Sequence, residues 1–432
     1  MRQARKGLFT LFTLVVLLAW AGGNGWQALA ATEPVRLRVA VWGTPADYQE
    51  IVDAFKKANP GVDVRLEPSG WGEYWSRLQT QIAGGVAPDV VRMSGAYLGD
   101  FAADGALVPL DSWIARDKVD LSQYFNTGDI FRYAGHIYGL PEYGDIMGIY
   151  YNIDRFEQRG VPAPSDRWQW SDLAAAAKKL TVYKADGTVQ QWGLLLDLFI
   201  GGNGQTSWVN FLLQNGTRAL DETKTRALFD QPAAIEAIQF LADLYQKDHS
   251  IPSYPEVDFT FQSFTDEKAA MMYAIVPIGI PYIGQNARFR WDIGPMARQK
   301  RMASETNFVG FAITRGAKNP ELAWKFVQFV AGPVGQAVIA RKRAGLPALK
   351  AAAFSAEFLV PEKAPRRLAE VLQATTPYTY DLQFTPGWSE WTLAADQQVT
   401  QAVLGTVSVQ QAMRTATEKV NAILARARGA KK

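Results

Sequence analysis

The stretch between residues 35 and 94 constrains the fold most, because strand and helix patterns alternate along it. VRLRVAVWG alternates and then becomes apolar, which predicts a buried strand ending at Trp42. Residues 47–59, stopped by a Pro-Gly pair, predict a helix. VDVRLEP, a helix over 74–83 and the strand PDVVRMS complete a β-α-β-α-β order. This order predicts parallel strands with right-handed crossovers and a ligand site outside their carboxyl ends.

At 432 residues the chain is long enough for two lobes, since single hydrophobic cores stop growing at about 250–300 residues. The extended apolar segment HIYGLPEYGDIMGIYYN, interrupted by glycines and a proline, predicts the first crossing into a second lobe. FVGFAIT predicts a strand that returns to the first lobe. We therefore expect a first lobe of residues 31–143 and 310–377, a second lobe of residues 144–309, and C-terminal helices over 378–432 that pack back on the second lobe.

The N-terminus has the pattern of a secretory signal peptide over residues 1–30. Arg2, Arg5 and Lys6 precede a short apolar stretch, and Ala28-Leu29-Ala30 supplies small residues for cleavage after Ala30. The alternative is a short membrane anchor, although stretches of this length rarely span a bilayer. The pattern predicts export.

Composition narrows the function. The chain has no cysteine, so an exported form has no disulfide and no cysteine to lipidate, which favours a soluble periplasmic protein. With His136 and His249 as the two histidines, we predict no metal site. A net charge of +3 with interspersed signs predicts no nucleic-acid partner.

Several segments, taken in order, resemble the extracellular solute-binding proteins of ABC importers, in the sugar-binding class that includes maltose-binding and glycerol-phosphate-binding proteins. They are FKKANPGVDVRLEP, WSRLQTQIAGGVAPDVV, ADGALVPLDSWI, YGLPEYGDIMGIYYN, WSDLAAAAKKL, FDQPAAIEAIQFLADLY, DEKAAMMYA and KNPELAWKFVQFVAGPVGQ. The resemblance implies an α/β, two-lobed periplasmic-binding-protein fold with open, mostly parallel sheets. It also implies about three hinge crossings, which we place near residues 143–148, 308–312 and 376–385. The implied protein is a monomer without a cofactor, which holds one sugar in its cleft and docks on the permease subunits of an ABC importer.

Candidate site residues follow from what a saccharide needs. Aromatic rings stack on an apolar sugar face, and carboxylates accept charge-assisted hydrogen bonds from its hydroxyl groups. For each ring, packing in the core is an equally acceptable explanation. The candidates at strand ends and in loops are Trp42, Asp47, Glu73, Ser94, Tyr143, Asp145, Asn203, Trp208, Tyr273, Arg343 and Trp388.

One departure from the family limits the choice of sugar. After AAMM the maltose-type pattern continues with Gly-Pro-Trp, but this chain reads YAIVPIGIPYI. The expected ring is missing, although Tyr273 or Tyr282 could substitute for it from another angle, so maltose specificity does not carry over. Arg343 is the candidate donor to a phosphate group if the solute carries one.

Two other functions remain to be compared. A secreted carbohydrate-active enzyme would need two carboxylates across the scissile bond, and Glu142 and Asp145 are the nearest pair. Acids three residues apart on an extended segment point to opposite faces, so we predict no catalysis. A protein of the same fold for a polyamine, a peptide or a ferric ion is the third possibility, with Tyr378 and Tyr380 as iron ligands.

Overall fold

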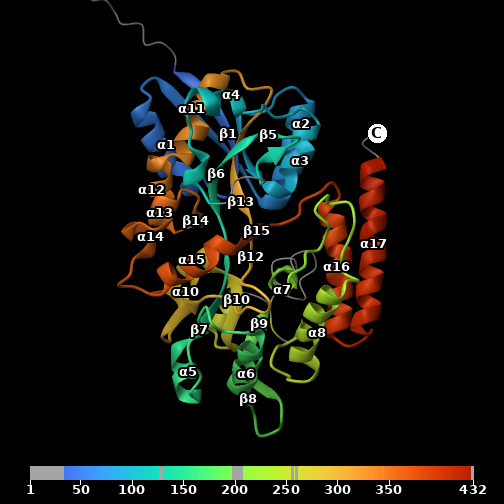
Figure 1. The fold of residues 1–432 in the computed structure, drawn as a ribbon. Coiled ribbons are helices and arrows are strands. Elements are labelled where there is room, and N and C mark those ends of the chain that lie inside the picture. Colours follow the sequence, from blue (N-terminus) through green and yellow to red (C-terminus); the bar gives the residue numbers. More distant parts are fainter. Residues whose placement is uncertain are drawn as a thin grey trace, which may run out of the picture.

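The computed structural model describes residues 34–125, 130–196, 208–253, 257, 261–343 and 345–429. Two sheets with flanking helices form two lobes, and Figure 1 shows β1, β13 and β6 in the upper lobe and β7, β10 and β9 in the lower one. The expected two-lobed α/β fold is confirmed. The predicted signal peptide and Asn203 lie outside the described residues.

The first lobe is built on a six-stranded sheet with the order β14-β6-β13-β3-β1-β2. β1 pairs in parallel with β2 and β3, as the β-α-β-α-β pattern predicts. The strands are β1 (Val35–Trp42), β2 (Val62–Ser69), β3 (Val90–Ser94), β6 (Gly139–Gly144), β13 (Phe308–Ile313) and β14 (Leu346–Pro347).

Helices cover this sheet. The first of them begins with a capping box in which Thr44 and Asp47 satisfy each other's backbone groups, with Pro45 at the first position and lysines in the last turn. The first lobe holds α1 (Pro45–Ala58), α2 (Trp71–Ala83), α3 (Gly95–Ala103), α4 (Asp111–Arg116), α11 (Pro320–Ala331), α12 (Pro333–Lys342), α13 (Lys350–Ala353) and α14 (Ala356–Leu359), with the hairpin β4 (Arg132–Tyr133) and β5 (His136–Ile137).

The second lobe is built on a five-stranded sheet with the order β11-β7-β10-β9-β8. Its strands are β7 (Met147–Asn152), β8 (Val182–Tyr183), β9 (Val189–Leu196), β10 (Ala269–Ile275) and β11 (Trp291–Gly294). Its helices are α5 (Ile153–Arg159), α6 (Trp170–Leu180), α7 (Trp208–Gln214), α8 (Pro232–Gln246), α9 (Phe261–Thr265), α10 (Val276–Asn286), α15 (Leu368–Thr375), α16 (Trp388–Val403) and α17 (Val409–Gly429).

Both sheets are mixed, so the expectation of mostly parallel sheets is wrong. In the first sheet β13 runs antiparallel to β3 and β6, and β14 runs antiparallel to β6. In the second sheet only β9 and β10 are parallel. The reason is topological: β13 and β7 enter their lobes from the other lobe and therefore run opposite to the strands joined by helical crossovers, while β8 and β9 form a hairpin.

The chain passes between the sheets three times. The first passage lies between β6 and β7, where the sequence predicted it, and the second lies at β12 (Ser304–Thr306), directly before β13. The third lies between α14, which packs on α12, and α15, which packs on β11. This third passage comes before residue 368, earlier than the expected 376–385, because α15 already belongs to the second lobe. β12 pairs with β15 (Thr379–Asp381) in a small sheet of its own.

The C-terminal helices lie beside the second lobe. α16 and α17 pack on each other and on α8, and Figure 1 shows them along the flank of the lower lobe. Their apolar faces belong to the buried cluster on one face of the second sheet. The buried residues on the opposite face of this sheet belong to the same cluster as the core of the first lobe.

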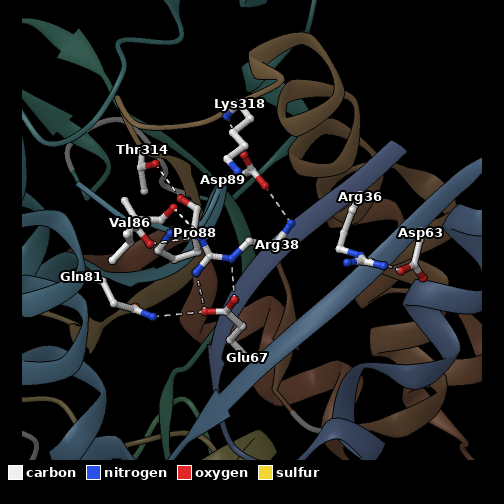
Figure 2. A network of polar contacts seen from close by, with 11 residues as sticks. Arg36, Arg38, Asp63, Glu67, Gln81, Val86, Pro88, Asp89, Thr314 and Lys318 are labelled. Atoms are coloured by element: carbon white, nitrogen blue, oxygen red, sulfur yellow. Dashed lines mark hydrogen bonds and ion pairs between the residues drawn. The ribbon is translucent and has the colours of Figure 1, made fainter. Parts of the chain in front are cut away.

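A saturated polar network fixes one end of the first sheet (Figure 2). Nε of Arg38 donates to Glu67 over 2.7 Å, and Nη1 of the same side chain donates to the backbone of the loop before β3. The buried Asp89 carboxylate accepts from the backbone N–H groups of Arg38 and Lys318, over 2.8 and 2.7 Å. Every buried acid here has donors, so the network stabilises the lobe.

In the described part of the chain, no single helix has the length and apolarity to cross a bilayer, and only α11 with α12, bent by 49°, passes such a test as a pair.

Candidate ligand-binding site

An aromatic cluster lies where β1 and β3 of the first sheet end. The Trp42 ring lies edge-on to Trp71, with centroids 5.0 Å apart, and Trp75 stacks on Tyr97 at 3.8 Å. Tyr74 meets both Trp42 and Trp75. Trp71 keeps 47% of its surface exposed at the start of α2. This edge of the sheet therefore presents flat apolar rings on a rigid base.

A buried ion pair lies beside this cluster. Nε of Arg92 donates to Oε2 of Glu142 over 2.7 Å, with both side chains almost completely buried. The Arg92 guanidinium lies 4.1 Å from the Trp42 ring centroid and 5.0 and 5.5 Å from the Tyr143 and Tyr48 centroids. Burial by itself would lower the pKa of Arg92, but Glu142 outweighs this effect and raises that pKa. Arg92 therefore keeps its charge inside a ring of aromatic side chains, whereas burial raises the pKa of Glu142 although Arg92 opposes that effect.

The ion pair and the rings enclose a cavity of about 290 Å³. Three of the predicted site residues, Trp42, Asp47 and Tyr143, come together here. Sequence reasoning placed neither Arg92 nor Lys342 in a site, and considered Glu142 together with Asp145 at the first crossing. The lining residues are Trp42, Gly43, Asp47, Tyr48, Ile51, Arg92, Glu142, Tyr143, Ile339 and Lys342. Flat rings next to charged hydrogen-bonding groups can hold a compact polyhydroxy compound.

The walls of this cavity are held by close packing. A side chain at Gly345 would place its Cβ 2.2 Å from the Tyr143 ring, so glycine at this position lets the ring lie where it does. Nζ of Lys342 donates to the backbone oxygens of Ala46 and Asp47, over 3.0 and 2.6 Å. These bonds join the end of α12 to the start of α1.

Two predicted polar residues cap helices. The Asp47 carboxylate accepts from the backbone and hydroxyl of Thr44, over 2.7 and 3.0 Å, at the start of α1. Ser94 is 2% exposed and accepts from the backbone of Ala96 at the start of α3. The Ser94 hydroxyl is thus part of the lobe, and the prediction that it faces a ligand is wrong for this structure.

Two acids, the half-buried Asp145 and the buried Glu305, lie on the first and second passages between the lobes. Oδ1 of Asp145 accepts from the Asn307 backbone N–H over 2.8 Å, and its backbone oxygen accepts from the Thr306 hydroxyl over 2.6 Å. Burial raises the pKa of Asp145 to about 7. Burial, with the added repulsion of Asp145, raises the pKa of Glu305. Sequence reasoning found Asp145 and missed Glu305.

Two predicted rings lie in the core of the second lobe, so their assignment to a ligand cleft is wrong for this structure. Trp208 is 0% exposed and Tyr273 is 1% exposed. Nε1 of Trp208 donates to Asp396 over 2.5 Å, and the Tyr273 hydroxyl donates to the sulfur of Met296 over 3.3 Å. Helices from distant parts of the chain cover both rings.

The other predicted residues are dispersed. Glu73 is exposed in the first turn of α2. Arg343 has a left-handed backbone (φ 52°) at the end of α12, and its buried Nε and Nη2 have no hydrogen-bond partner among the described residues. Burial lowers the pKa of Arg343, while the nearby Tyr150 opposes that effect. Trp388 begins α16 and packs edge-on against Phe384.

Phe384 lines a second cavity, of about 210 Å³, that lies between the lobes. The start of α3 and the β4–β5 hairpin contribute from the first lobe, whereas Lys224 and Asp381 contribute from the second. The described part of the chain holds no group of three or more His, Cys, Asp or Glu residues placed to bind a metal ion.

Two α/β lobes joined by three passages, with cavities at the sheet edge and between the lobes, define a two-lobed solute-binding protein. The chain belongs to the family of bacterial extracellular solute-binding proteins, whose model matches residues 42–337. The resemblance stated from the sequence is thereby confirmed.

Relatives cover nearly the whole chain. A putative binding protein from Brucella abortus is 25% identical over 403 residues, 90% of this chain and 93% of the relative. The sn-glycerol-3-phosphate-binding periplasmic protein UgpB from Escherichia coli is 24% identical over 408 residues, 88% of this chain and 90% of the relative.

Solved structures share the fold. A substrate-binding protein from Listeria monocytogenes in complex with cycloalternan has a TM-score of 0.77 and 24% identity, covering 91% of this chain and 99% of its own. The sugar-binding protein MalE from Xanthomonas citri has a TM-score of 0.78 and 21% identity, covering 92% and 99%.

Proposed function

We propose that the protein is an exported, periplasmic component of an ABC importer, which captures a monosaccharide or oligosaccharide between its lobes and delivers it to the permease subunits. The observation that carries this proposal is the cavity of about 290 Å³ in which Trp42, Tyr48 and Tyr143 surround the Arg92–Glu142 pair. Rings of this kind stack on a sugar face, and the charged pair can bond to its hydroxyl groups.

The ligands of structural neighbours agree with a sugar. The neighbour from Listeria monocytogenes holds cycloalternan, and one from Thermotoga lettingae, with a TM-score of 0.74, holds alpha-D-tagatose. These ligands differ in size, so they support the class of ligand and leave its length open.

Glycerol phosphate, or another small anionic solute, is the second candidate. The relative UgpB is named for binding sn-glycerol 3-phosphate, and within the described part of the chain the buried Nε and Nη2 of Arg343 have no hydrogen-bond partner. The planar guanidinium group of an arginine can form two parallel hydrogen bonds to a phosphate group. The glycerol phosphate hypothesis therefore depends on Arg343.

The proposal includes binding without catalysis, by a monomer. The Glu142 carboxylate is engaged by Arg92, and Asp145 bonds to the backbone of Asn307 on the second passage. These contacts give neither acid the position of a glycosidase carboxyl group, which lies beside the scissile bond. The relatives described above are named for binding solutes.

A thermal-shift screen of the mature chain tests the proposal, with maltose, trehalose, tagatose, glucosamine and sn-glycerol 3-phosphate as probes. A true ligand at 100 times its dissociation constant adds about 2.7 kcal/mol to the free energy of unfolding, and calorimetry then measures its affinity. A screen in which no sugar raises the melting temperature contradicts the proposal, and released reducing ends contradict the absence of catalysis.

A further inference from the structure

Glu305 is a buried acid whose carboxylate has no hydrogen-bond donor among the residues that the structure describes. It is 1% exposed, and in the described part of the chain neither of its carboxylate oxygens accepts a hydrogen bond. A buried carboxylate loses its hydration, and without hydrogen-bond donors this desolvation cost is not compensated. The group is therefore incomplete until something donates to it.

The backbone holds Glu305 in place. Its N–H donates to Oδ1 of Asn210 over 2.7 Å, and its carbonyl accepts from the Ser304 hydroxyl over 2.7 Å. It also pairs in register with Tyr380 of β15. Ser304 and Thr306 turn their hydroxyls to the first passage, so alternation along the strand directs Glu305 to the opposite face.

The network of Figure 2 shows how this chain treats a buried acid with a structural role. Glu67 accepts from Arg38 over 2.7 and 3.2 Å and from Gln81 over 3.3 Å. Asp89, 3% exposed, accepts two backbone N–H groups. Glu305 has no such donors, which separates it from these structural acids.

The surroundings of Glu305 are acidic or neutral. The titratable groups that interact electrostatically with Glu305 are Asp145 on the first passage and Tyr273, and Tyr380 is its partner in register on β15. The cation on this segment, Arg301, donates to the Leu213 backbone and lies over the Tyr380 ring at 4.7 Å. Among the described residues no ion pair reaches Glu305. A ligand group placed here meets two carboxyl groups and no nearby counter-charge.

We infer that Glu305 is a specificity-determining residue of the proposed sugar site, where it accepts hydrogen bonds from a hydroxyl or ammonium group of the ligand and, with Asp145, disfavours ligands that carry a phosphate. The ligand class is thus a neutral sugar or an amino sugar. Glu305 lines neither cavity described above, so ligand access requires a change in the angle between the lobes, which would move the passage on which Glu305 lies. This inference rests on the proposed function.

The test compares Glu305→Gln with the parent protein and with Glu236→Gln, a surface acid paired with Lys300. Maltose, glucosamine and sn-glycerol 3-phosphate are titrated calorimetrically at several pH values. The Glu305 variant loses at least tenfold in affinity for the sugar that the parent binds, and its preference for that sugar over glycerol phosphate narrows. The parent's affinity for the sugar rises with pH as Glu305 ionises, and the variant lacks this rise. The Glu236 variant matches the parent.

Each remaining outcome overturns the inference in a distinguishable way. Unchanged sugar affinity and pH dependence in Glu305→Gln, with a higher melting temperature, identify the carboxyl as a protonated core group, while sugar binding stands. A parent protein that prefers glycerol phosphate to every sugar refutes the ligand class but keeps solute binding. A parent that binds none of the sugars removes both the proposed function and this inference.

Discussion

Nε of Arg92 donates to Oε2 of Glu142 over 2.7 Å across the width of a strand, because β13 lies between β3 and β6, which carry the two residues. The pair therefore ties the strand that leaves for the second lobe to the parallel strands of the first. It also forms one wall of the cavity beside Trp42 and Tyr143. Structure and proposed binding depend on the same two charges.

Glu142→Gln should lower the free energy of unfolding by about 3 kcal/mol, because it leaves the Arg92 charge buried without a counter-charge. Urea denaturation measures the loss. Combining Arg92→Met with Glu142→Leu should recover most of it, since an apolar pair of similar volume leaves no buried charge. Glu321→Gln, which breaks an exposed pair with Arg116, should leave stability nearly unchanged. Equal losses of unfolding free energy in Glu142→Gln and Glu321→Gln would contradict this account.

Asp145→Asn should stabilise the protein above pH 7 and flatten its stability profile below that pH. Burial raises the pKa of Asp145 to about 7 in the folded state, above its usual 3.8. The folded protein therefore holds a proton that the unfolded chain has lost, and stability falls as pH rises from about 4 to 7. Each unit of pKa corresponds to about 1.4 kcal/mol. Denaturant titrations at pH 5 and pH 8 check the sign, and identical slopes in both proteins would refute it.

The alternation of strand and helix patterns over residues 35–94 was sufficient to predict β1, α1, β2, α2 and β3, because each of these elements depends on local periodicity. The structure also brings to one cavity the candidates Trp42, Asp47 and Tyr143, which were chosen separately from a strand end, a loop and the first crossing.

Other features depend on contacts that no local pattern encodes. Trp208 donates to Asp396, which lies 188 positions later in the chain. The sequence near Trp208 therefore does not show whether the ring lies in the core or in the cleft. Glu305 stands out only because donors are missing around it, and an absence of donors can be seen only in three dimensions. Arg92 sits in a short apolar strand, and its pairing with Glu142 depends on the order of strands in the sheet.

Trp42→Ala should weaken sugar binding at least tenfold, because the ring lines the cavity and also lies over Arg92 at 4.1 Å. Aromatic anchors of this kind contribute on the order of 2–4 kcal/mol to binding. Trp42→Phe, which keeps a ring, should recover part of the affinity. Trp113→Ala is the matched control, since that ring stacks on Trp324 away from the cavity. Calorimetry decides, and equal affinities of the Trp42 and Trp113 alanine variants would place the ligand elsewhere.

Trp208→Ala should reduce stability and leave sugar affinity unchanged, the reverse of what a cleft ring would do. The side chain is 0% exposed, its ring packs on Phe229 with centroids 5.5 Å apart, and its Nε1 donates to Asp396. Removing such a ring leaves a cavity and takes one donor away from Asp396, at a cost of about 3–5 kcal/mol. Trp71→Ala, which removes a ring that is 47% exposed, should cost far less stability. Urea denaturation and calorimetry on both variants separate the two roles. If the Trp208→Ala protein unfolds like the parent but binds sugar tenfold more weakly, the Trp208 ring contacts the ligand and this prediction is wrong.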